Sequence, residues 1–344
     1  MKQFSRFLSI LLSLVLLSSL VLNTTATDLN TSYRINTPYE YPITPASPEW
    51  LAMSTHSERI RSCQIPEDIL INMSTSSLVE TIATYPLLID LMLFNTADDA
   101  YSSLLNNFNA VRELESRADA LPVLTSFIKT NTDIQSDYIR KTALEIIALS
   151  GRFPSLQLST YTSLQLDFSE AYKFYPDLTS SSTSSAAQLR VAAPTTPSGN
   201  AITEPWEYNK TPEHTLEKIG LLEEEILAVY GLYPARDATV KYNCHSYAFH
   251  DQSANNLYWI DFPDDYLEDP LVTSIPLSQV RVNDRICYRV STSGRFMHSG
   301  IITIANNATT MVTSKWGAAG LYNHTIGNCP SSYGNYVSFY RVDN

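Results

Sequence analysis

The sequence predicts an α+β protein with an all-helical N-terminal domain and a C-terminal domain in which helices precede an antiparallel sheet. Three observations lead to this class. Apolar residues recur with helical spacing in the first half of the chain, a Ser/Thr/Pro-rich stretch follows, and alternating segments fill the C-terminal part. We place a signal peptide at residues 1–26, the helical domain at 47–177, a flexible linker at 178–205 and the C-terminal domain at 206–344.

The composition excludes several functional classes. The chain has 344 residues and a net charge of −12, from 23 basic and 35 acidic residues, and no basic cluster, so we expect no nucleic-acid partner. Its 10 glycines argue against Gly-rich nucleotide-binding folds. Four cysteines without a CxxC pair indicate neither a disulfide scaffold nor a zinc site, and we expect no metal and no cofactor.

The N-terminal segment has the pattern of a secretory signal peptide. Lys2 and Arg6 precede an apolar run over residues 7–22, and the small residues Thr24 and Ala26 follow it. We therefore expect a secreted protein, extracellular or associated with a cell wall, without a membrane span after signal cleavage. An uncleaved signal anchor is the alternative, although the run is short for a bilayer span.

The next part of the chain predicts a bundle of helices. Apolar residues between 78 and 89 follow helical spacing, and Pro86 is expected to kink or divide that helix. Similar stripes over 104–114 and 134–149 predict two further helices, the last ending at Gly151. No catalytic motif is visible in this domain, so its expected role is to bind an unknown protein or a wall component.

The C-terminal domain is expected to begin with a helix and continue as strands. Thr211 is the expected cap of the helix, and Gly231 is expected to end it. The strand-like segments span residues 285–290, 298–304, 310–315 and 336–342. Helices followed by strands favour an antiparallel sheet in an α+β domain.

One cysteine and one histidine carry the candidate chemistry. Asn243 is a good helix N-cap and would leave Cys244 in the first turn of a short helix. Backbone N–H groups and the helix dipole favour an anion there, so we expect a lowered thiol pKa and a nucleophilic thiolate. Such a thiolate needs a general base, and His298 at the start of a strand is the candidate.

These residues lie in motifs that resemble those of papain-like cysteine hydrolases of the NlpC and CHAP type. The matching motifs are Asn243-Cys244, Cys244-x-x-Tyr247-Ala248, His298-Ser299-Gly300-Ile301 and Asn283-Asp284-Arg285-Ile286, the last with Asn283 in place of the usual glycine. The resemblance covers about residues 230–342. It implies a papain-like domain in which Cys244 attacks amide bonds with His298 as the base, and peptidoglycan as the substrate.

The third catalytic group is less defined. A two-residue hairpin turn at 306–307 would place His298 opposite Lys315 and one step from Ser314. Lysine is a poor orienter for an imidazole that becomes positively charged. Ser314 or His324 is therefore the candidate third polar group.

Other assignments stay open at this point. Trp259, Trp316 and Tyr247 are candidates for substrate binding, or are part of the core. Cys287 and Cys329 either form a disulfide or remain separate. Two alternatives to a peptidoglycan amidase remain, namely a catalytically silent cell-surface binding module and a cysteine hydrolase or transamidase that acts on proteins.

Overall fold

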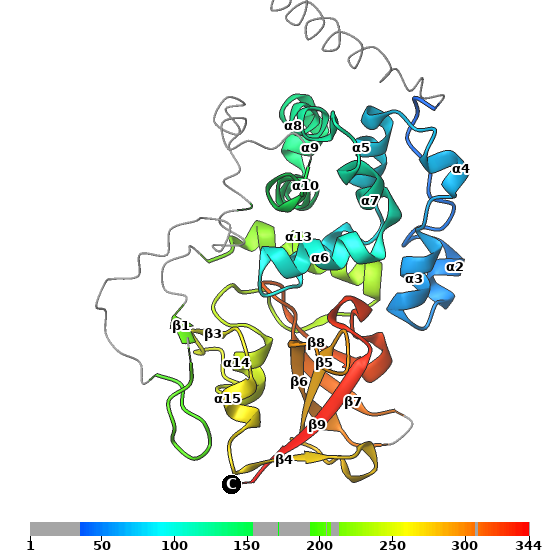
Figure 1. Ribbon diagram of the computed structural model, residues 1–344. Helices are drawn as coiled ribbons and strands as arrows, with labels where there is room; N and C mark the ends of the chain where they lie inside the picture. The colour runs from blue at the N-terminus through cyan, green and yellow to red at the C-terminus, as the bar shows by residue number, and fades with distance from the viewer. Residues whose placement is uncertain are drawn as a thin grey trace, which may run out of the picture.

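The structure is a computed structural model that describes residues 35–153, 171, 193–203, 205–207, 213–306 and 309–343. The predicted signal peptide and most of the predicted linker lie outside these residues. Within the described ranges, no helix combines the length and the apolar character that crossing a bilayer requires. Helices lie above an antiparallel sheet (Figure 1), so the α+β class is confirmed.

The N-terminal part consists of short helices that begin at side-chain caps. Thr55 and Glu58 form a capping box at the start of the second of these helices, and Thr96 accepts a hydrogen bond from the backbone N–H of Asp99. The elements are α2 (Pro48–Ala52), α3 (His56–Ser62), α4 (Glu67–Leu70), α5 (Thr75–Ala83), η1 (Leu88–Met92), α6 (Ala97–Asn107), α7 (Asn109–Glu115), α8 (Ala120–Thr130), α9 (Thr132–Ser136) and α10 (Tyr138–Ser150).

Proline and glycine end helices as expected, but one predicted start is wrong. Pro86 lies between α5 and the 3-10 helix η1, so it divides the predicted helix. Helix α13 (Leu216–Tyr230) ends at Gly231, which adopts a left-handed conformation with φ 69°. It starts later than expected, because Thr215 caps it rather than Thr211, which lies outside the described residues.

The C-terminal part is built on a seven-stranded sheet in which every neighbouring pair is antiparallel. Its strands, in spatial order, are β2 (Pro234–Arg236), β8 (Leu321–Thr325), β7 (Met311–Lys315), β6 (Phe296–Ile304), β5 (Arg285–Arg289), β9 (Tyr336–Val342) and β4 (Val272–Ile275). β1 (Pro205–Glu207) and β3 (Tyr258–Ile260) form a separate two-stranded ribbon. The remaining elements are α15 (Asp264–Leu267), η3 (Leu277–Gln279), η4 (Ile326–Asn328) and η5 (Ser331–Tyr333). The four predicted strands correspond to β5, β6, β7 and β9.

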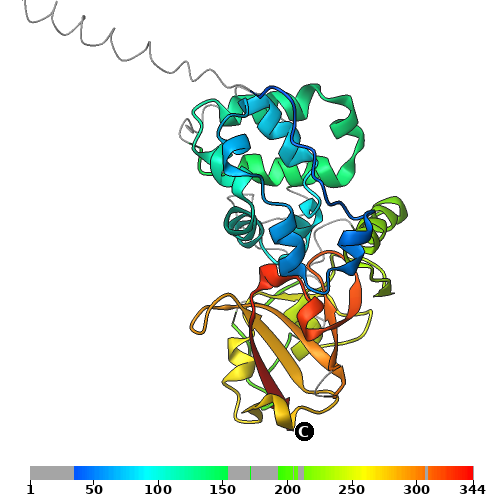
Figure 2. The ribbon, with the colours of Figure 1, turned by 90° about the vertical axis from the view of Figure 1, so that its right-hand side faces the viewer.

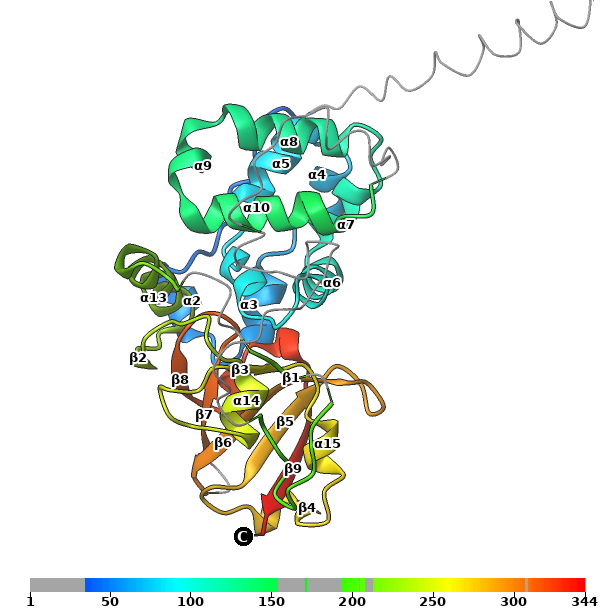
Figure 3. The same ribbon diagram turned by 90° about the vertical axis from the view of Figure 1, so that its left-hand side faces the viewer.

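The two faces of the sheet have different neighbours. Helix α14 (Cys244–Phe249) lies against one face (Figure 3), where Tyr247 packs with Ile301. Ile302 and Val312, which point to the other face, belong to the same hydrophobic core as the N-terminal helices. Figure 2 shows those helices lying against one end of the sheet. The helical region and the sheet therefore share a continuous core.

A polar network also joins the two regions. The Nε2 of His56 lies 2.8 Å from an Asp90 carboxylate oxygen, and the Tyr230 hydroxyl donates to the other oxygen at 2.5 Å. The Nδ1 of His56 lies 2.9 Å from the Ser331 hydroxyl. This order of groups resembles a serine hydrolase triad, but the backbone N–H of Ser331 also donates to Nδ1 at 3.0 Å. Because that donor occupies the nitrogen lone pair, we interpret the network as a structural tie.

Candidate active site

Cys244 is the first residue of α14, as the sequence predicts. The side-chain oxygen of Asn243 accepts the backbone N–H of Ser246 at 3.0 Å and thereby caps the helix. The same side chain bonds to both backbone groups of Ile260, with its nitrogen donating at 2.8 Å. The ribbon strand β3 therefore fixes the cap, and the cap fixes the position of the thiol.

The Cys244 thiol is enclosed by hydrogen-bond donors. It is 1% exposed, and the side-chain nitrogen of Asn95, from the segment that follows η1, lies 3.6 Å from Sγ. Burial raises the pKa of this thiol, while backbone N–H groups of Ser299 and His245 and the Asn95 side chain act in the opposite direction. The expectation of a lowered pKa is therefore wrong for this closed arrangement, because desolvation outweighs the donors.

Lys315 is a second ionisable group on the same face of the sheet. Its ammonium nitrogen donates to the backbone carbonyls of Thr239 at 2.8 Å and Gly317 at 2.6 Å, and its side chain is fully buried. Burial lowers the pKa of Lys315 to about 7, although the negative charges of Glu213 and Cys244 act to raise it. Part of the Lys315 population is therefore a neutral amine near neutral pH, close enough to Cys244 for the two charges to interact.

His298 lies on the opposite face of the sheet from Cys244. Successive strand residues point to opposite faces, and Ser299 faces α14, where its hydroxyl lies 2.8 Å from the His245 ring. The His298 ring instead stacks on Tyr333, with centroids 4.0 Å apart, and neighbours Tyr288. The structure therefore does not form the predicted Cys244–His298 dyad.

The environment of the His298 ring is also unusual for a polar side chain. It is fully buried, and neither ring nitrogen has a hydrogen-bond partner in the described part of the chain. Burial lowers the pKa of His298 well below its usual value, so the ring is neutral. A buried polar group without a partner costs about 1–3 kcal/mol.

The register of β6 and β7 differs from the expected one by one residue. A two-residue turn would pair Ile301 with Val312, but Ile301 pairs with Thr313 and the pairing is irregular between Ile302 and Ile304. A shift of one residue moves every side chain to the other face. Lys315 consequently shares a face with Ser299 instead of lying opposite His298.

Ser314 and His324 bond to each other rather than to His298. The Ser314 hydroxyl lies 2.7 Å from the Nε2 of His324 and accepts the indole N–H of Trp316 at 3.0 Å. Both residues lie on the face of His298, away from α14. Neither is in position to orient a base for Cys244, so the expected third group is not found there.

The aromatic residues proposed for substrate binding are buried. Trp316 is fully buried between Tyr230 and Tyr322, and Trp259 donates its indole N–H to the Val240 carbonyl at 2.6 Å. Tyr247 is 7% exposed. In this structure they form core rather than a groove rim. The four cysteines, including Cys287 and Cys329, are free thiols, so the possible disulfide is not formed.

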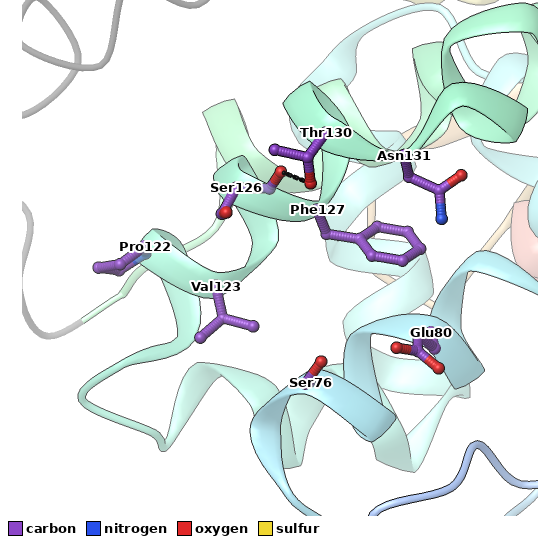
Figure 4. A pocket seen from close by; sticks show the side chains of 8 residues that line it. All are labelled: Ser76, Glu80, Pro122, Val123, Ser126, Phe127, Thr130 and Asn131. Atoms are coloured by element: carbon purple, nitrogen blue, oxygen red, sulfur yellow. Dashed lines mark hydrogen bonds between the residues drawn. The ribbon is translucent and has the colours of Figure 1, made fainter.

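A small recess is lined in part by Asn95, the residue that contacts the Cys244 thiol. It has a volume of about 40 Å³, and Asp99, Asp261, Phe262 and Arg295 contribute to its lining. Asp99 and Arg295 form an ion pair across it. A larger recess of about 600 Å³ lies between α5 and α8 (Figure 4), but Glu80 is the single ionisable residue among those that line it. The recess beside Asn95 is therefore the better candidate for access to Cys244.

Comparison with known proteins adds no assignment, because no family model, curated protein or solved structure matches this chain. Sequence reasoning missed the roles of Lys315 and Asn95. Lys315 left a weak signal in the sequence, because it is a charged residue within a strand-like segment, between Ser314 and Trp316. Asn95 left no such signal, because it contacts Cys244 from a distant part of the chain.

Proposed function

We propose that the protein is a cysteine hydrolase that cleaves amide bonds with Cys244 as the nucleophile. The observation that carries the proposal is the convergence of three features on one thiol. These are the capped start of α14, the Asn95 carboxamide 3.6 Å from Sγ, and the buried Lys315 amine on the same face. A helix that begins with cysteine and packs on an antiparallel sheet also supports the papain-like arrangement implied by the sequence.

Lys315 takes the place of His298 as the general base in this proposal. A neutral Lys315 amine accepts the thiol proton, and the Cys244 thiolate attacks the amide carbonyl carbon to form a tetrahedral intermediate. The Lys315 ammonium then protonates the leaving amine as the C–N bond breaks, which leaves a thioester on Cys244. Water, deprotonated by Lys315, hydrolyses the thioester to a carboxylic acid and restores the thiol. A lysine with a pKa near 7 suits both proton transfers.

The donors around the thiol have a second use during the reaction. The backbone N–H of Ser299 and the Asn95 side-chain nitrogen are close enough to stabilise negative charge at Sγ. In a tetrahedral intermediate the negative charge moves to the former carbonyl oxygen, next to Sγ. Donors that are already fixed in place stabilise such an oxyanion without reorganisation.

Substrate access requires a movement, since Cys244 is 1% exposed. Asn95 contacts the thiol and also lines the small recess, so we expect displacement of the segment that follows η1 to open a path between the two. The recess is lined by charged groups, among them Asp99 and Arg295, which favours a polar, charged substrate. The peptide stems of peptidoglycan belong to this class, and an exported protein would meet them at a cell wall.

The test is mass spectrometry of peptidoglycan digested with the full chain lacking its predicted signal peptide. We expect new muropeptides from the wild type and none from Cys244→Ala. Lys315→Met, which removes the base, should slow release by about 10²–10⁴-fold. Lys315→Arg should be as slow, because arginine keeps the charge but does not deprotonate. Cys287→Ala, which alters another buried thiol, is the matched control and should retain activity.

Four outcomes would contradict or revise the proposal in different ways. Equal release by wild type and Cys244→Ala would exclude Cys244 as the nucleophile. Equal loss in Cys287→Ala would indicate a general effect on folding. Absence of release from peptidoglycan, together with saturable binding that survives Cys244→Ala, would favour a silent binding module. Cleavage of protein substrates alone would keep the nucleophile and change the substrate class.

A further inference from the structure

Three potential metal ligands meet on the face of the sheet that points away from α14. His298 comes from β6, His324 from β8, and Cys329 from the loop that follows η4. One ligand atom from each lies within 4.8 Å of the others, and all three residues are buried. We propose that His298, His324 and Cys329 bind a zinc ion. This site is independent of Cys244 and of the proposed hydrolase activity.

His298 provides the first independent support. It is fully buried, and neither ring nitrogen has a hydrogen-bond partner among the residues that the structure describes. Its ring lies parallel to that of Tyr333, with an interplanar angle of 4°, so stacking fixes the plane in which its nitrogens point. A buried imidazole of fixed orientation without a protein partner is suited to bind a ligand, and imidazole nitrogen is among the preferred donors of Zn²⁺.

His324 is held in the protonation state that a metal ligand requires. Its Nδ1 lies 2.9 Å from the Thr325 carbonyl, which can only accept, so the ring proton is on Nδ1 and the lone pair is on Nε2. The Ser314 hydroxyl lies 2.7 Å from Nε2 and is also bonded to the Trp316 indole. On metal binding, Nε2 would coordinate zinc and Ser314 would give up this hydrogen bond. The Thr325 carbonyl then serves as the outer partner that orients the ligating ring.

Cys329 supplies the third donor. Its thiol loses a proton to solvent as the zinc–sulfur bond forms, so binding releases one proton for each ion. The Tyr288 hydroxyl lies beside this sulfur and can donate to the thiolate. Ligand atoms around tetrahedral zinc lie about 3.3–3.8 Å apart, so the cluster would contract by about 1 Å. The position of Cys329 in a loop between η4 and Pro330 permits that movement.

The spacing of the three ligands in the chain explains why the sequence did not indicate a metal site. The ligands are separated by 26 residues (298 to 324) and 5 residues (324 to 329), and neither spacing matches a compact zinc motif. They converge because β6 and β8 flank β7 and because the segment that follows η4 brings Cys329 close to both histidines. Three protein ligands leave a fourth position on a tetrahedral ion for water or for the Tyr288 hydroxyl.

The test uses the full chain, treated with a chelator, dialysed and then incubated with Zn²⁺ alone. Elemental analysis after desalting should find one zinc ion per chain for the wild type. His298→Gln and Cys329→Ser should bind at least about 100-fold more weakly. Two control variants should retain zinc. Cys287→Ser alters a buried thiol on the other face of the sheet, and Ser314→Ala removes only the hydroxyl that competes for His324. With Co²⁺ in place of Zn²⁺, a thiolate-to-metal charge-transfer band should be present in the wild type and absent in Cys329→Ser.

Each contrary result overturns the site. A wild type that retains no zinc, or that shows no charge-transfer band with Co²⁺, would exclude it without reference to any variant. Equal zinc retention by wild type, His298→Gln and Cys329→Ser would place the ion elsewhere. Circular dichroism identifies a variant that fails to fold. In that case the Co²⁺ spectrum of the wild type alone decides whether the metal site exists. Zn²⁺ should also raise the unfolding temperature of the wild type but not that of His298→Gln.

Discussion

The rings of His298 and Tyr333 are stacked, with their centroids 4.0 Å apart and their planes within 4° of each other. This stacking holds the histidine on the face of β6 that points away from α14. Ser299, the next residue, faces α14 and bonds to His245. The two residues that the sequence most directly suggests as a catalytic pair, Cys244 and His298, are therefore separated by the sheet itself.

The first prediction concerns which residue controls the reactivity of Cys244. Lys315→Met should slow alkylation of Cys244 by iodoacetamide near neutral pH. Loss of the nearby positive charge raises the pKa of the thiol, and one pKa unit changes the thiolate fraction about tenfold. His298→Gln should leave the rate within about twofold of wild type. Peptide mass spectrometry that resolves the Cys244 peptide from the Cys287 peptide measures both rates. Slowing by His298→Gln but not by Lys315→Met would restore His298 as the base.

A second prediction follows from the pKa of Lys315 and concerns the free energy of unfolding. This pKa is about 7 in the folded protein and 10.5 without burial. Between these values the unfolded chain binds a proton that the folded protein does not, so stability rises with pH. The expected slope is about 1.4 kcal/mol per pH unit. Below pH 7 both states are protonated and this contribution is constant.

Urea unfolding of wild type and Lys315→Met at several pH values between about 7 and 8.5 measures this slope. The difference between the two proteins isolates Lys315, because the other titrating groups are common to both. The wild type should gain stability relative to the variant as the pH rises. A difference that does not change with pH would mean that Lys315 keeps an ordinary pKa in the folded protein.

Much of the fold follows from local signals in the sequence. Gly231 ends α13 because a left-handed residue is required there, and Pro86 separates α5 from η1 because it cannot continue a helix. The Asn243 cap places Cys244 at the start of α14 as expected. These features depend on a few neighbouring residues, so the sequence alone is sufficient to predict them.

The sites depend on relationships that the sequence does not encode locally. All five residues from His298 to Ile302 are buried, so β6 lacks the polar and apolar alternation that would identify its two faces. The face of the sheet on which the Lys315 side chain lies depends on a register irregularity between Ile302 and Ile304. Asn95 is 149 residues from Cys244 in the chain, and no periodic pattern connects them.

A third prediction concerns acid stability through His245. Burial lowers the pKa of His245 from 6.5 to about 3, so the folded protein holds this ring neutral while the unfolded chain protonates it. Its stabilising contribution is present above pH 6.5 and is lost as the pH falls toward 3, at about 1.4 kcal/mol per pH unit. His245→Gln should show a shallower loss of unfolding free energy between about pH 6.5 and 5. An unchanged slope, measured by urea unfolding, would contradict the assignment.

The last prediction concerns the segment that covers Cys244. Gly317 has φ 48°, and an added Cβ would lie 2.5 Å from the backbone carbonyl carbon of Leu93, two residues before Asn95. Gly317→Ala should therefore push this segment away from the sheet and lower the free energy of unfolding by about 1–2 kcal/mol or more. Because Asn95 moves with Leu93, alkylation of Cys244 by iodoacetamide should become faster.

Gly220→Ala is the matched control, because that glycine lies inside α13 and an added Cβ would meet nothing within 4 Å. It should stabilise the protein by about 0.4–1 kcal/mol and leave the alkylation rate of Cys244 unchanged. If Gly317→Ala lowers stability but Cys244 reacts at the wild-type rate, the segment that contains Asn95 does not control access to the thiol. A reagent would then reach Cys244 by another route, and the recess beside Asn95 would lose its role in substrate entry.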